Sequence, residues 1–335
     1  MSGLTIYNPS IALDEIQEPI PAVQFTEYWG GLFPFNDTFR AELKRREADC
    51  GYADFIAEYL VYPPKGPMPS RLPGTNADGT TKDSCWNIYW DIFDAILLLN
   101  PCFDIYQVAT TCPLLWDVLG FPGSMPYLPA GGTIYFDRAD VKRAIHAPNT
   151  TWEECSSRDV FVNGTDRSPP STVSALPHVI DATKNVIIAH SALDMILLAN
   201  GTLLSIQNMT WGNQRGFTHR PDQPFYVPHN NIATTPTLAG AGVFGSLASE
   251  RGLTFVGVDL AGHMVPQYAP SAAYRHVEYM LGRVACMNCT VPFTTDRGTP
   301  QSTGALGKGT APQGWSTGGK KGGGHHGRMT PRPRK

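Results

Sequence analysis

The chain has 335 residues, of which 42% are hydrophobic and 16% are charged. This length suffices for about two domains with a large core, which excludes a small disulfide-knotted peptide and a fully disordered polymer. The formal net charge is −3, but residues 291–335 hold eight of the 26 basic and only one of the 29 acidic residues. The preceding part, with 18 basic and 28 acidic residues, carries a charge of −10, which disfavours binding to nucleic acid.

Two segments in the first 130 residues have the spacing of amphipathic helices. In residues 52–60, and again in residues 86–97, apolar side chains recur three and four residues apart. Residues 63–82 between them are rich in Pro, Gly and Thr, which predicts a loop. Cys50 and Cys85 flank this loop, so a disulfide between them would link the two helices; the alternative is two buried thiols.

Beyond residue 131 the pattern changes to alternating helices and buried strands. Asp137 is expected to cap a short helix over residues 141–145. The apolar runs of residues 186–188 and 253–260 predict strands covered on both faces, as in a parallel sheet. A final amphipathic helix, ended by Gly282, is predicted with an apolar face made of Ala273, Val277, Met280 and Leu281.

The last 45 residues contain eleven Gly, five Pro and few aliphatic side chains. Such a segment cannot bury enough apolar surface to offset the entropy of ordering it, so it is predicted to be disordered. The expected fold class is therefore α/β, with a mainly helical region and a disordered C-terminal tail.

Cysteines and glycosylation sequons indicate an oxidising secretory compartment. The six Asn-x-Ser/Thr sequons begin at Asn36, Asn149, Asn163, Asn200, Asn208 and Asn288. The seven cysteines lack the spacing of a zinc site, so disulfides are favoured and no metal is expected; they are Cys50, Cys85, Cys102, Cys112, Cys155, Cys286 and Cys289. Because seven is odd, one thiol is free, pairs between chains or has a partner outside this sequence. For Cys286 and Cys289, a structural bridge or two loose thiols are favoured over redox chemistry.

The first residues do not read as a secretory leader. They lack the basic start and the apolar run of a signal peptide, and no stretch of 18 apolar residues predicts a membrane span. Since the sequons and cysteines indicate secretion, we expect that a further N-terminal part precedes Met1 in the natural protein.

Two polar residues follow the two predicted strands. Asp194 comes after the first strand and His263 after the second. In an open α/β sheet, reactive groups lie beyond the carboxyl ends of strands, and a hydrolase triad there runs in the order nucleophile, acid, histidine. Asp194 and His263 fit the last two positions, in which the carboxylate orients the imidazole and the imidazole deprotonates the nucleophile. The alternatives are a helix-capping Asp and a structural His.

Several segments resemble the fungal serine carboxypeptidases, α/β-hydrolases that remove C-terminal residues from peptides in the vacuole or outside the cell. Within residues 4–283 they are IYNPSIALDEIQEPIPAV, NPCFDIYQV, CPLLWDVLGFP, YFDRADVKRAIHAP, NVIIAHSALDMILLANGTLLSIQNMTW and GLTFVGVDLAGHMVPQYAPSAAYR. The resemblance implies that Asp194 is the catalytic acid, His263 the catalytic base and Met264 a neighbour of the substrate pocket. It also implies a peptide or protein substrate and no cofactor.

The resemblance further implies a division into domains. Residues 1–24 would be a remnant of the hydrolase core, 25–130 a helical cap inserted over the cleft, 131–285 the C-terminal half of the core and 286–335 the tail. The fold would thus be a partial α/β-hydrolase sheet with an inserted, mainly helical cap. No binding to nucleic acid or membranes is expected, and the oligomeric state is not predicted.

The chain also departs from the family. It lacks the Gly-Glu-Ser-Tyr segment that carries the family's nucleophile and the Gly-Gly-Pro-Gly segment of the oxyanion hole. In the family both segments, and the partner of the cysteine at position 155, precede the part represented here. The chain is therefore expected to be a carboxypeptidase portion that is inactive alone. The alternative is a secreted, non-catalytic peptide-binding protein of the same fold; acyl transfer by the same residues is a third hypothesis.

Ser191 is a rival candidate for the nucleophile because it follows a strand. A nucleophile elbow needs a very small residue two places after the serine, where this chain has Leu193. Ser191 would also need a later acid, and Asp259 lies within the strand that leads to His263. Ser191 is therefore predicted to be a small strand-end residue.

Overall fold

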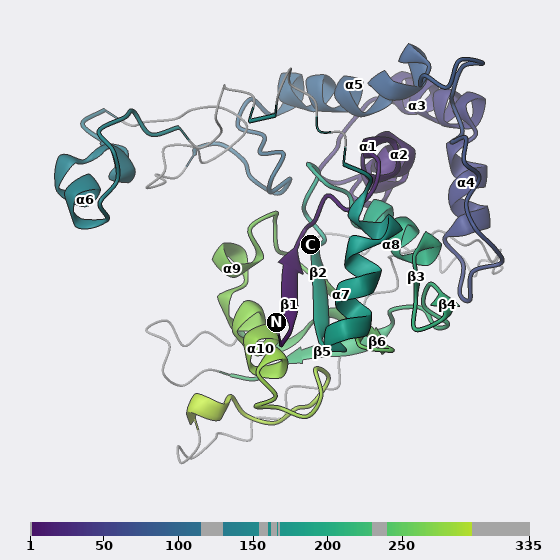
Figure 1. Cartoon of the computed structure of the whole chain (residues 1–335). Helices are drawn as coiled ribbons and strands as arrows, with labels where there is room; N and C mark the ends of the chain where they lie inside the picture. The colour runs from purple at the N-terminus through teal and green to yellow at the C-terminus, as the bar shows by residue number, and fades with distance from the viewer. Residues whose placement is uncertain are drawn as a thin grey trace, which may run out of the picture.

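The computed structural model describes residues 2–114, 130–153, 160–161, 166, 168–229 and 240–296. At its centre is a five-stranded sheet with helices on both faces (Figure 1). The strands lie in the order β1 (Leu4–Tyr7), β2 (Val186–Ser191), β7 (Leu253–Val258), β6 (Gly242–Glu250) and β5 (Gln223–Val227). β1, β2 and β7 run parallel, whereas β6 pairs antiparallel with both β7 and β5.

The strands expected at residues 186–188 and 253–260 are confirmed as β2 and β7. The prediction that helices and strands alternate is wrong for β6 and β7, which follow each other directly and form an antiparallel hairpin. Arg251 and Gly252, the two residues at its turn, both have positive φ, 53° and 89°. Two such residues twist a two-residue turn in the direction that a β-hairpin needs.

Alternate residues of β2 pack on opposite faces of the sheet. Val186 and Ile188 belong to the larger apolar cluster, which includes side chains of α7 (Ala175–Thr183) and α8 (Ala199–Asn208). Ile187 and Ala189 belong to a smaller cluster that includes side chains of α10 (Pro270–Met280). All six residues of β2 are buried. The unbroken apolar run is explained by this double cover, since neither face of the strand meets water.

A layer of helices lies beyond one end of the sheet (Figure 1). It consists of α1 (Asp14–Gln17), α2 (Pro19–Tyr28), α3 (Asp37–Cys50), α4 (Tyr52–Tyr59) and α5 (Asp83–Leu99). The helices predicted over residues 52–60 and 86–97 are confirmed as α4 and α5, with the expected loop between them. Their apolar faces bury side chains such as Phe55 and Ile92 in the core.

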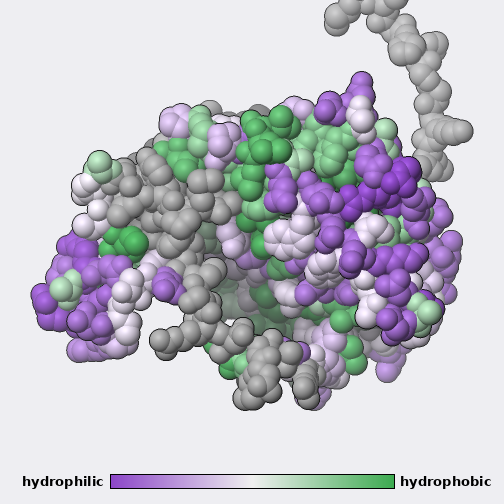
Figure 2. All heavy atoms as spheres, turned by 90° about the horizontal axis from the view of Figure 1, so that it is seen from above, coloured by the Kyte–Doolittle hydropathy of each residue, from purple (hydrophilic) through white to green (hydrophobic). Residues whose placement is uncertain are grey.

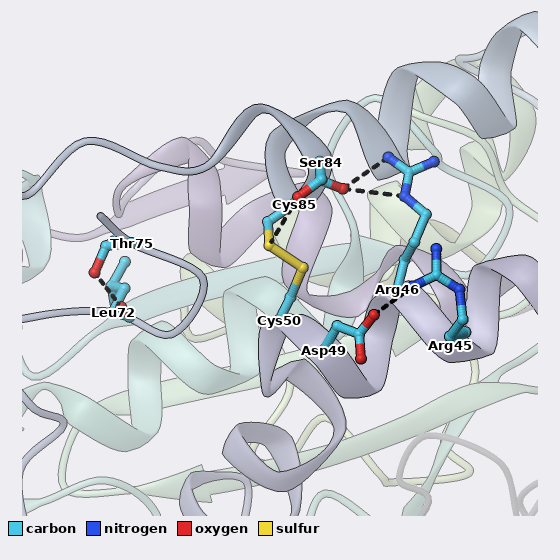
Figure 3. The surroundings of a disulfide bond; sticks show 8 residues. All are labelled: Arg45, Arg46, Asp49, Cys50, Leu72, Thr75, Ser84 and Cys85. Carbon is cyan, nitrogen blue, oxygen red and sulfur yellow. Dashed lines mark hydrogen bonds and ion pairs between the residues drawn. A yellow bond between two sulfur atoms is a disulfide. The ribbon is translucent and has the colours of Figure 1, made fainter. Parts of the chain in front are cut away.

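The predicted disulfide between Cys50 and Cys85 is confirmed (Figure 3). It joins the end of α3, a helix that is not predicted from the sequence, to the first turn of α5. Beside it, Arg46 donates hydrogen bonds of 3.0 and 2.7 Å to the carbonyl oxygen of Ser84. The bridge spans 35 residues, and closing such a loop in the unfolded chain stabilises the fold by about 2–4 kcal/mol. Cys102 and Cys112, which are also disulfide candidates, form a second bridge, and Cys286 and Cys289, for which the sequence leaves a bridge or two thiols open, form a third. Position 155 lies outside the described residues.

Residues 130–153 form a small unit that lies away from the sheet (Figure 1), with a 3₁₀ helix η1 (Tyr135–Asp137) and α6 (Ala139–Ala144). The expected cap is wrong: the N-cap residue of α6 is Arg138, without a capping side-chain bond. The Asp137 carboxylate instead accepts hydrogen bonds from the Lys142 ammonium at 2.9 Å and the Trp152 amide at 2.7 Å. The Asp137 carboxylate thus ties the end of α6 and residue 152 together instead of capping the helix.

The other described elements are η3 (Ser171–Val173), α7 (Ala175–Thr183), α8 (Ala199–Asn208), β3 (Thr210–Trp211), β4 (Gln214–Arg215), α9 (Val265–Tyr268), α10 (Pro270–Met280) and η5 (Thr294–Asp296). The predicted last helix is confirmed as α10, followed by Gly282 in a left-handed conformation, φ 68°. Its predicted apolar face is partly wrong, because Val277 is 38% and Leu281 55% exposed. α10 instead buries three polar side chains, Arg275, His276 and Glu278.

The domain boundaries at residues 25, 131 and 286 stay predictions, and α2 runs across the first of them. The tail beyond residue 296 lies outside the described residues. Within the described ranges, no helix combines the length and apolar character needed to cross a membrane. Seen from above, the surface carries both hydrophilic areas and hydrophobic ones (Figure 2), and the exposed apolar side chains include Leu98 and Leu99 at the end of α5.

Candidate active site

The polar residues predicted at the strand ends lie together at one edge of the sheet. Asp194 follows β2 by three residues and His263 follows β7 by five. His263 Nδ1 lies 2.8 Å from Asp194 Oδ2, so the two side chains form a hydrogen-bonded pair across 69 residues of sequence. The parallel pairing of β2 with β7 places both strand ends at the same edge, which explains the contact.

Asp194 is fully buried and is held by the turn that follows it. Its Oδ1 accepts hydrogen bonds from the amides of Ile196, at 3.0 Å, and Leu197, at 3.4 Å. Burial raises the pKa of Asp194 to about 6, and the hydrogen bond from His263 opposes this rise. Above pH 6 the carboxylate is ionised and accepts a hydrogen bond from His263 Nδ1–H, which leaves Nε2 as the basic nitrogen.

His263 is the member of the pair that reaches solvent. Its side chain is 30% exposed, whereas that of Asp194 is 0% exposed. The His263 amide donates to the Tyr106 carbonyl oxygen at 2.7 Å, and the two rings lie 5.5 Å apart. An accessible imidazole held by a buried carboxylate is arranged to act as a general base.

Gly262 allows the loop that carries His263 to approach the segment around Tyr106. A Cβ atom at position 262 would lie 2.2 Å from the Tyr106 carbonyl oxygen and 2.9 Å from the ring of Tyr268. Neither contact is tolerable, so only glycine fits here without a displacement of the backbone. Close packing against Tyr106 and Tyr268 therefore requires glycine at the position before His263.

A second histidine, His190 of β2, lies next to the pair and is not identified from the sequence. It is fully buried, with Nε2 2.7 Å from the Leu197 carbonyl oxygen and 3.9 Å from Asp194 Oδ2. Burial lowers the pKa of His190 to about 3, so the ring is neutral and donates from Nε2 to Leu197. This bond stabilises the turn whose amides bind Asp194.

Ser191 makes structural contacts, as expected for a small strand-end residue. Its hydroxyl donates to the Gly262 carbonyl oxygen at 2.6 Å and accepts from Asn8 Nδ2 at 3.0 Å. Asn8 is a site residue that sequence reasoning does not single out. An Asn-Pro pair directly after the apolar run of β1 is the signal for a turn at this position.

The other predicted site residues are spread over the molecule. Met264 is half-buried ahead of α9, and its carbonyl oxygen accepts from the amides of Gln267 and Tyr268; its place beside a substrate pocket stays a prediction. Among the sequons, Asn36, Asn149 and Asn288 are exposed. Asn200 and Asn208 are half-buried, and Asn163 lies outside the described residues. The described residues contain no cluster of three or more His, Cys, Asp or Glu able to hold a metal ion.

The general Gly-x-Ser-x-Gly pattern of a nucleophile occurs once in the sequence, at residues 314–318. These residues lie outside the described part of the chain. They also follow His263, whereas α/β-hydrolases place the nucleophile before the acid and the histidine.

Comparison with known proteins places the chain in a family. Residues 67–283 match the serine carboxypeptidases. The chain belongs to this family. It is 53% identical over 279 residues to a probable serine carboxypeptidase of Arthroderma benhamiae, which covers 83% of this chain and 51% of that protein. It is 42% identical over 299 residues to serine-type carboxypeptidase F of Aspergillus niger, with 84% and 55% covered, so it spans about half the length of these relatives.

A solved structure has the same fold. The prohormone-processing carboxypeptidase of Saccharomyces cerevisiae superimposes with a TM-score of 0.56 at 18% identity, covering 84% of this chain and 55% of that one. At this identity the likeness concerns the fold alone. The sheet and its helices are thus of the α/β-hydrolase type found in serine carboxypeptidases, as the sequence resemblance implies.

Proposed function

We propose that Asp194 and His263 are the acid and the base of a serine carboxypeptidase site. The observation that carries the proposal is the 2.8 Å hydrogen bond between the buried carboxylate and the partly exposed imidazole. The substrate is a peptide or protein, from which the enzyme releases the C-terminal residue. Family membership and the names of the relatives support this assignment. Three disulfides support a secreted or vacuolar location.

In this mechanism, His263 Nε2 removes the proton from a serine hydroxyl while the serine oxygen attacks the last peptide carbonyl. Asp194 stabilises the imidazolium that forms, and His263 then gives the proton to the departing amino group. Water, deprotonated by the same imidazole, hydrolyses the acyl-enzyme and regenerates the serine. No step needs a cofactor.

The chain by itself is inactive under this proposal. Among the described residues, no serine hydroxyl is hydrogen-bonded to His263 Nε2, and the Ser191 hydroxyl is committed to the Gly262 carbonyl oxygen. A base without a hydroxyl to deprotonate cannot start the acyl transfer. The nucleophile is therefore supplied by a part of the enzyme other than these residues.

The purified chain, incubated with a blocked dipeptide and with a fluorophosphonate probe, tests this proposal. We expect no hydrolysis, and no labelled serine in a peptide map by mass spectrometry. Labelling of Ser191, or of the serine at position 316, would contradict the assignment. Tight binding of the dipeptide to the unlabelled chain would favour the non-catalytic peptide-binding alternative.

A further inference from the structure

A buried asparagine connects the three strand ends that meet at the candidate site. Asn8 directly follows β1 and is 2% exposed. Its backbone is left-handed, with φ 42°, a conformation that asparagine tolerates better than most residues. Its amide donates to the Ala189 carbonyl oxygen of β2 at 2.9 Å, which continues the pairing of the two strands.

The Asn8 side chain binds both β2 and the loop that carries His263. Its Oδ1 accepts from the Ser191 amide at 2.6 Å, and its Nδ2 donates to the Ser191 hydroxyl at 3.0 Å. The same Nδ2 donates to the His263 carbonyl oxygen and lies 3.5 Å from that of Gly262. One amide group thus joins β1, the end of β2 and the residues that precede and include the histidine.

The backbone of His263 is held on two sides. Its amide is bound to the Tyr106 carbonyl oxygen at 2.7 Å, and its carbonyl oxygen is bound by Asn8. His263 lies beyond the last residue of β7, so no ladder hydrogen bonds of the sheet fix it. With both backbone groups bound, the Cα position is set, and the imidazole stays within hydrogen-bond distance of Asp194.

We propose that Asn8 is a positioning residue for His263, which fixes the backbone of the histidine through its carbonyl oxygen and thereby keeps the imidazole on Asp194. The inference rests on the proposed role of His263 as the base, but the geometry that it predicts is measurable without catalysis. A side-chain carboxamide supplies both the acceptor for the backbone N–H of Ser191 and the donors for the Ser191 hydroxyl and the His263 carbonyl oxygen.

The test is the exchange of the His263 Nδ1 proton with water, followed by NMR in the full chain labelled with ¹⁵N-histidine. The signal is assigned by its loss in His263→Gln. Asn8→Gly removes the side chain but accepts the left-handed backbone, so it separates positioning from strain. Asn213→Gly is the matched control, since Asn213 is exposed and has φ 63° in the turn between β3 and β4.

We expect slow exchange of the Nδ1 proton in the wild-type chain and in Asn213→Gly. In Asn8→Gly the exchange should be about tenfold faster, as expected from the loss of the hydrogen bond that holds the loop. Asn8→Asp keeps the acceptor but loses the donors above its pKa, so its exchange rate should lie between those of the wild type and Asn8→Gly. Far-UV circular dichroism and urea unfolding of each variant show that the chain is folded.

An unchanged exchange rate in folded Asn8→Gly would overturn the inference. If that variant does not fold, the same outcome in Asn8→Asp overturns it. Absence of a protected Nδ1 proton in the wild-type chain would instead refute the Asp194–His263 pair and the proposed function with it. A loss of protection confined to the Asn8 variants supports the inference.

Discussion

A pair of ionisable side chains at the strand ends and another on α10 each contain a fully buried carboxylate, but the two pairs differ in their access to solvent. At the strand ends, Asp194 binds His263 at 2.8 Å; on α10, Arg275 lies 3.1 Å from Glu278. The His263 side chain is 30% exposed, whereas Arg275 and Glu278 are both completely buried. Burial of a carboxylate is thus common to both pairs, and the access of one partner to solvent distinguishes the proposed catalytic pair from the pair on α10.

The pair on α10 has a structural role. Glu278 Oε1 accepts hydrogen bonds from the amide and the hydroxyl of Thr294, both at 2.6 Å. Arg275 donates to the Val291 carbonyl oxygen at 2.5 Å, and its guanidinium lies 4.9 Å from the ring centre of Phe293. The pair thus fastens the segment after α10 onto the helix, which a solvent-accessible pair could not do as firmly.

The largest expected effect is on this structural pair. Arg275→Ala leaves Glu278 buried without its partner, so the free energy of unfolding should fall by about 3–5 kcal/mol. Urea unfolding followed by circular dichroism at pH 7.5 measures the change. The exposed Arg283 offers a matched control, and Arg283→Ala should stay within about 0.5 kcal/mol of the wild type. A comparably small loss in Arg275→Ala would mean that the pair does not fasten the segment.

At the strand ends, removing the charge of the buried carboxylate by Asp194→Asn should stabilise the chain. The pKa of Asp194 rises from 3.8 to about 6 on folding, so the folded chain binds this proton more tightly than the unfolded chain. Burying the ionised carboxylate lowers the free energy of unfolding. This loss is full above pH 6, and it vanishes below about pH 4, where the carboxyl group is protonated in both states. Asp194→Asn should therefore raise the free energy of unfolding by about 1–3 kcal/mol at pH 8 and leave it unchanged near pH 4.

Urea unfolding at the two pH values measures this gain. Asp222→Asn, at an exposed position, is the control and should have no effect at either pH. Destabilisation of Asp194→Asn at pH 8 would show that the bond to His263 outweighs the cost of burial.

The pair of Asp194 and His263 can be predicted from the sequence, whereas the pair of Arg275 and Glu278 cannot, because the two depend on different kinds of information. Unbroken apolar runs mark β2 and β7, and chain order then places Asp194 and His263 at their ends. The buried face of α10 could not be read from periodicity, since Arg275 and Glu278 are covered by residues 291–294, which lie beyond the helix. A helical pattern shows apolar spacing and not a later segment that satisfies polar groups.

Asn8 and His190 show the same limit within the site itself. Their roles come from contacts with residues that are distant in sequence or in the turn after β2, and neither belongs to a recognisable motif. The antiparallel hairpin of β6 and β7 escapes prediction as well, because its turn depends on positive φ at Arg251 and Gly252. Cys50 and Cys85, by contrast, flank a loop between two clear helices, and their bridge follows from this local pattern.

A third test concerns His276, the histidine buried beside the α10 pair. Burial lowers its pKa to about 3, so below pH 6.5 the unfolded chain binds a proton that the folded chain does not, and stability falls as the pH decreases. His276→Gln retains a polar side chain near the Tyr7 hydroxyl, which lies 3.3 Å from His276 Nδ1. Between pH 7.5 and pH 5 the variant should lose about 2 kcal/mol less stability than the wild type. Parallel stability curves for the two proteins would contradict a neutral, buried His276.

The smallest expected effect concerns the sequons, whose occupancy by glycans should depend on the exposure of the asparagine side chain. Asn36, Asn149 and Asn288 are exposed and should carry glycans when the chain is secreted by a fungal host. Asn208 should not, because its Oδ1 accepts from the Met68 amide at 2.9 Å. Nor should Asn200, whose Oδ1 is buried without a hydrogen-bond partner among the described residues. Enzymatic deglycosylation in ¹⁸O-water with peptide mapping identifies the occupied sites, and a glycan at Asn208 would contradict this packing.

The central claim is that His263, oriented by Asp194, is the base for a serine outside the described residues. The most direct measurement is the kcat for a blocked dipeptide of a chimera that joins this chain to the part of the Arthroderma benhamiae relative that it does not match. We predict that the chimera hydrolyses the dipeptide and that Asp194→Asn lowers its kcat by about 10⁴-fold while the chimera stays folded. A kcat within about tenfold of the unsubstituted chimera would contradict the claim.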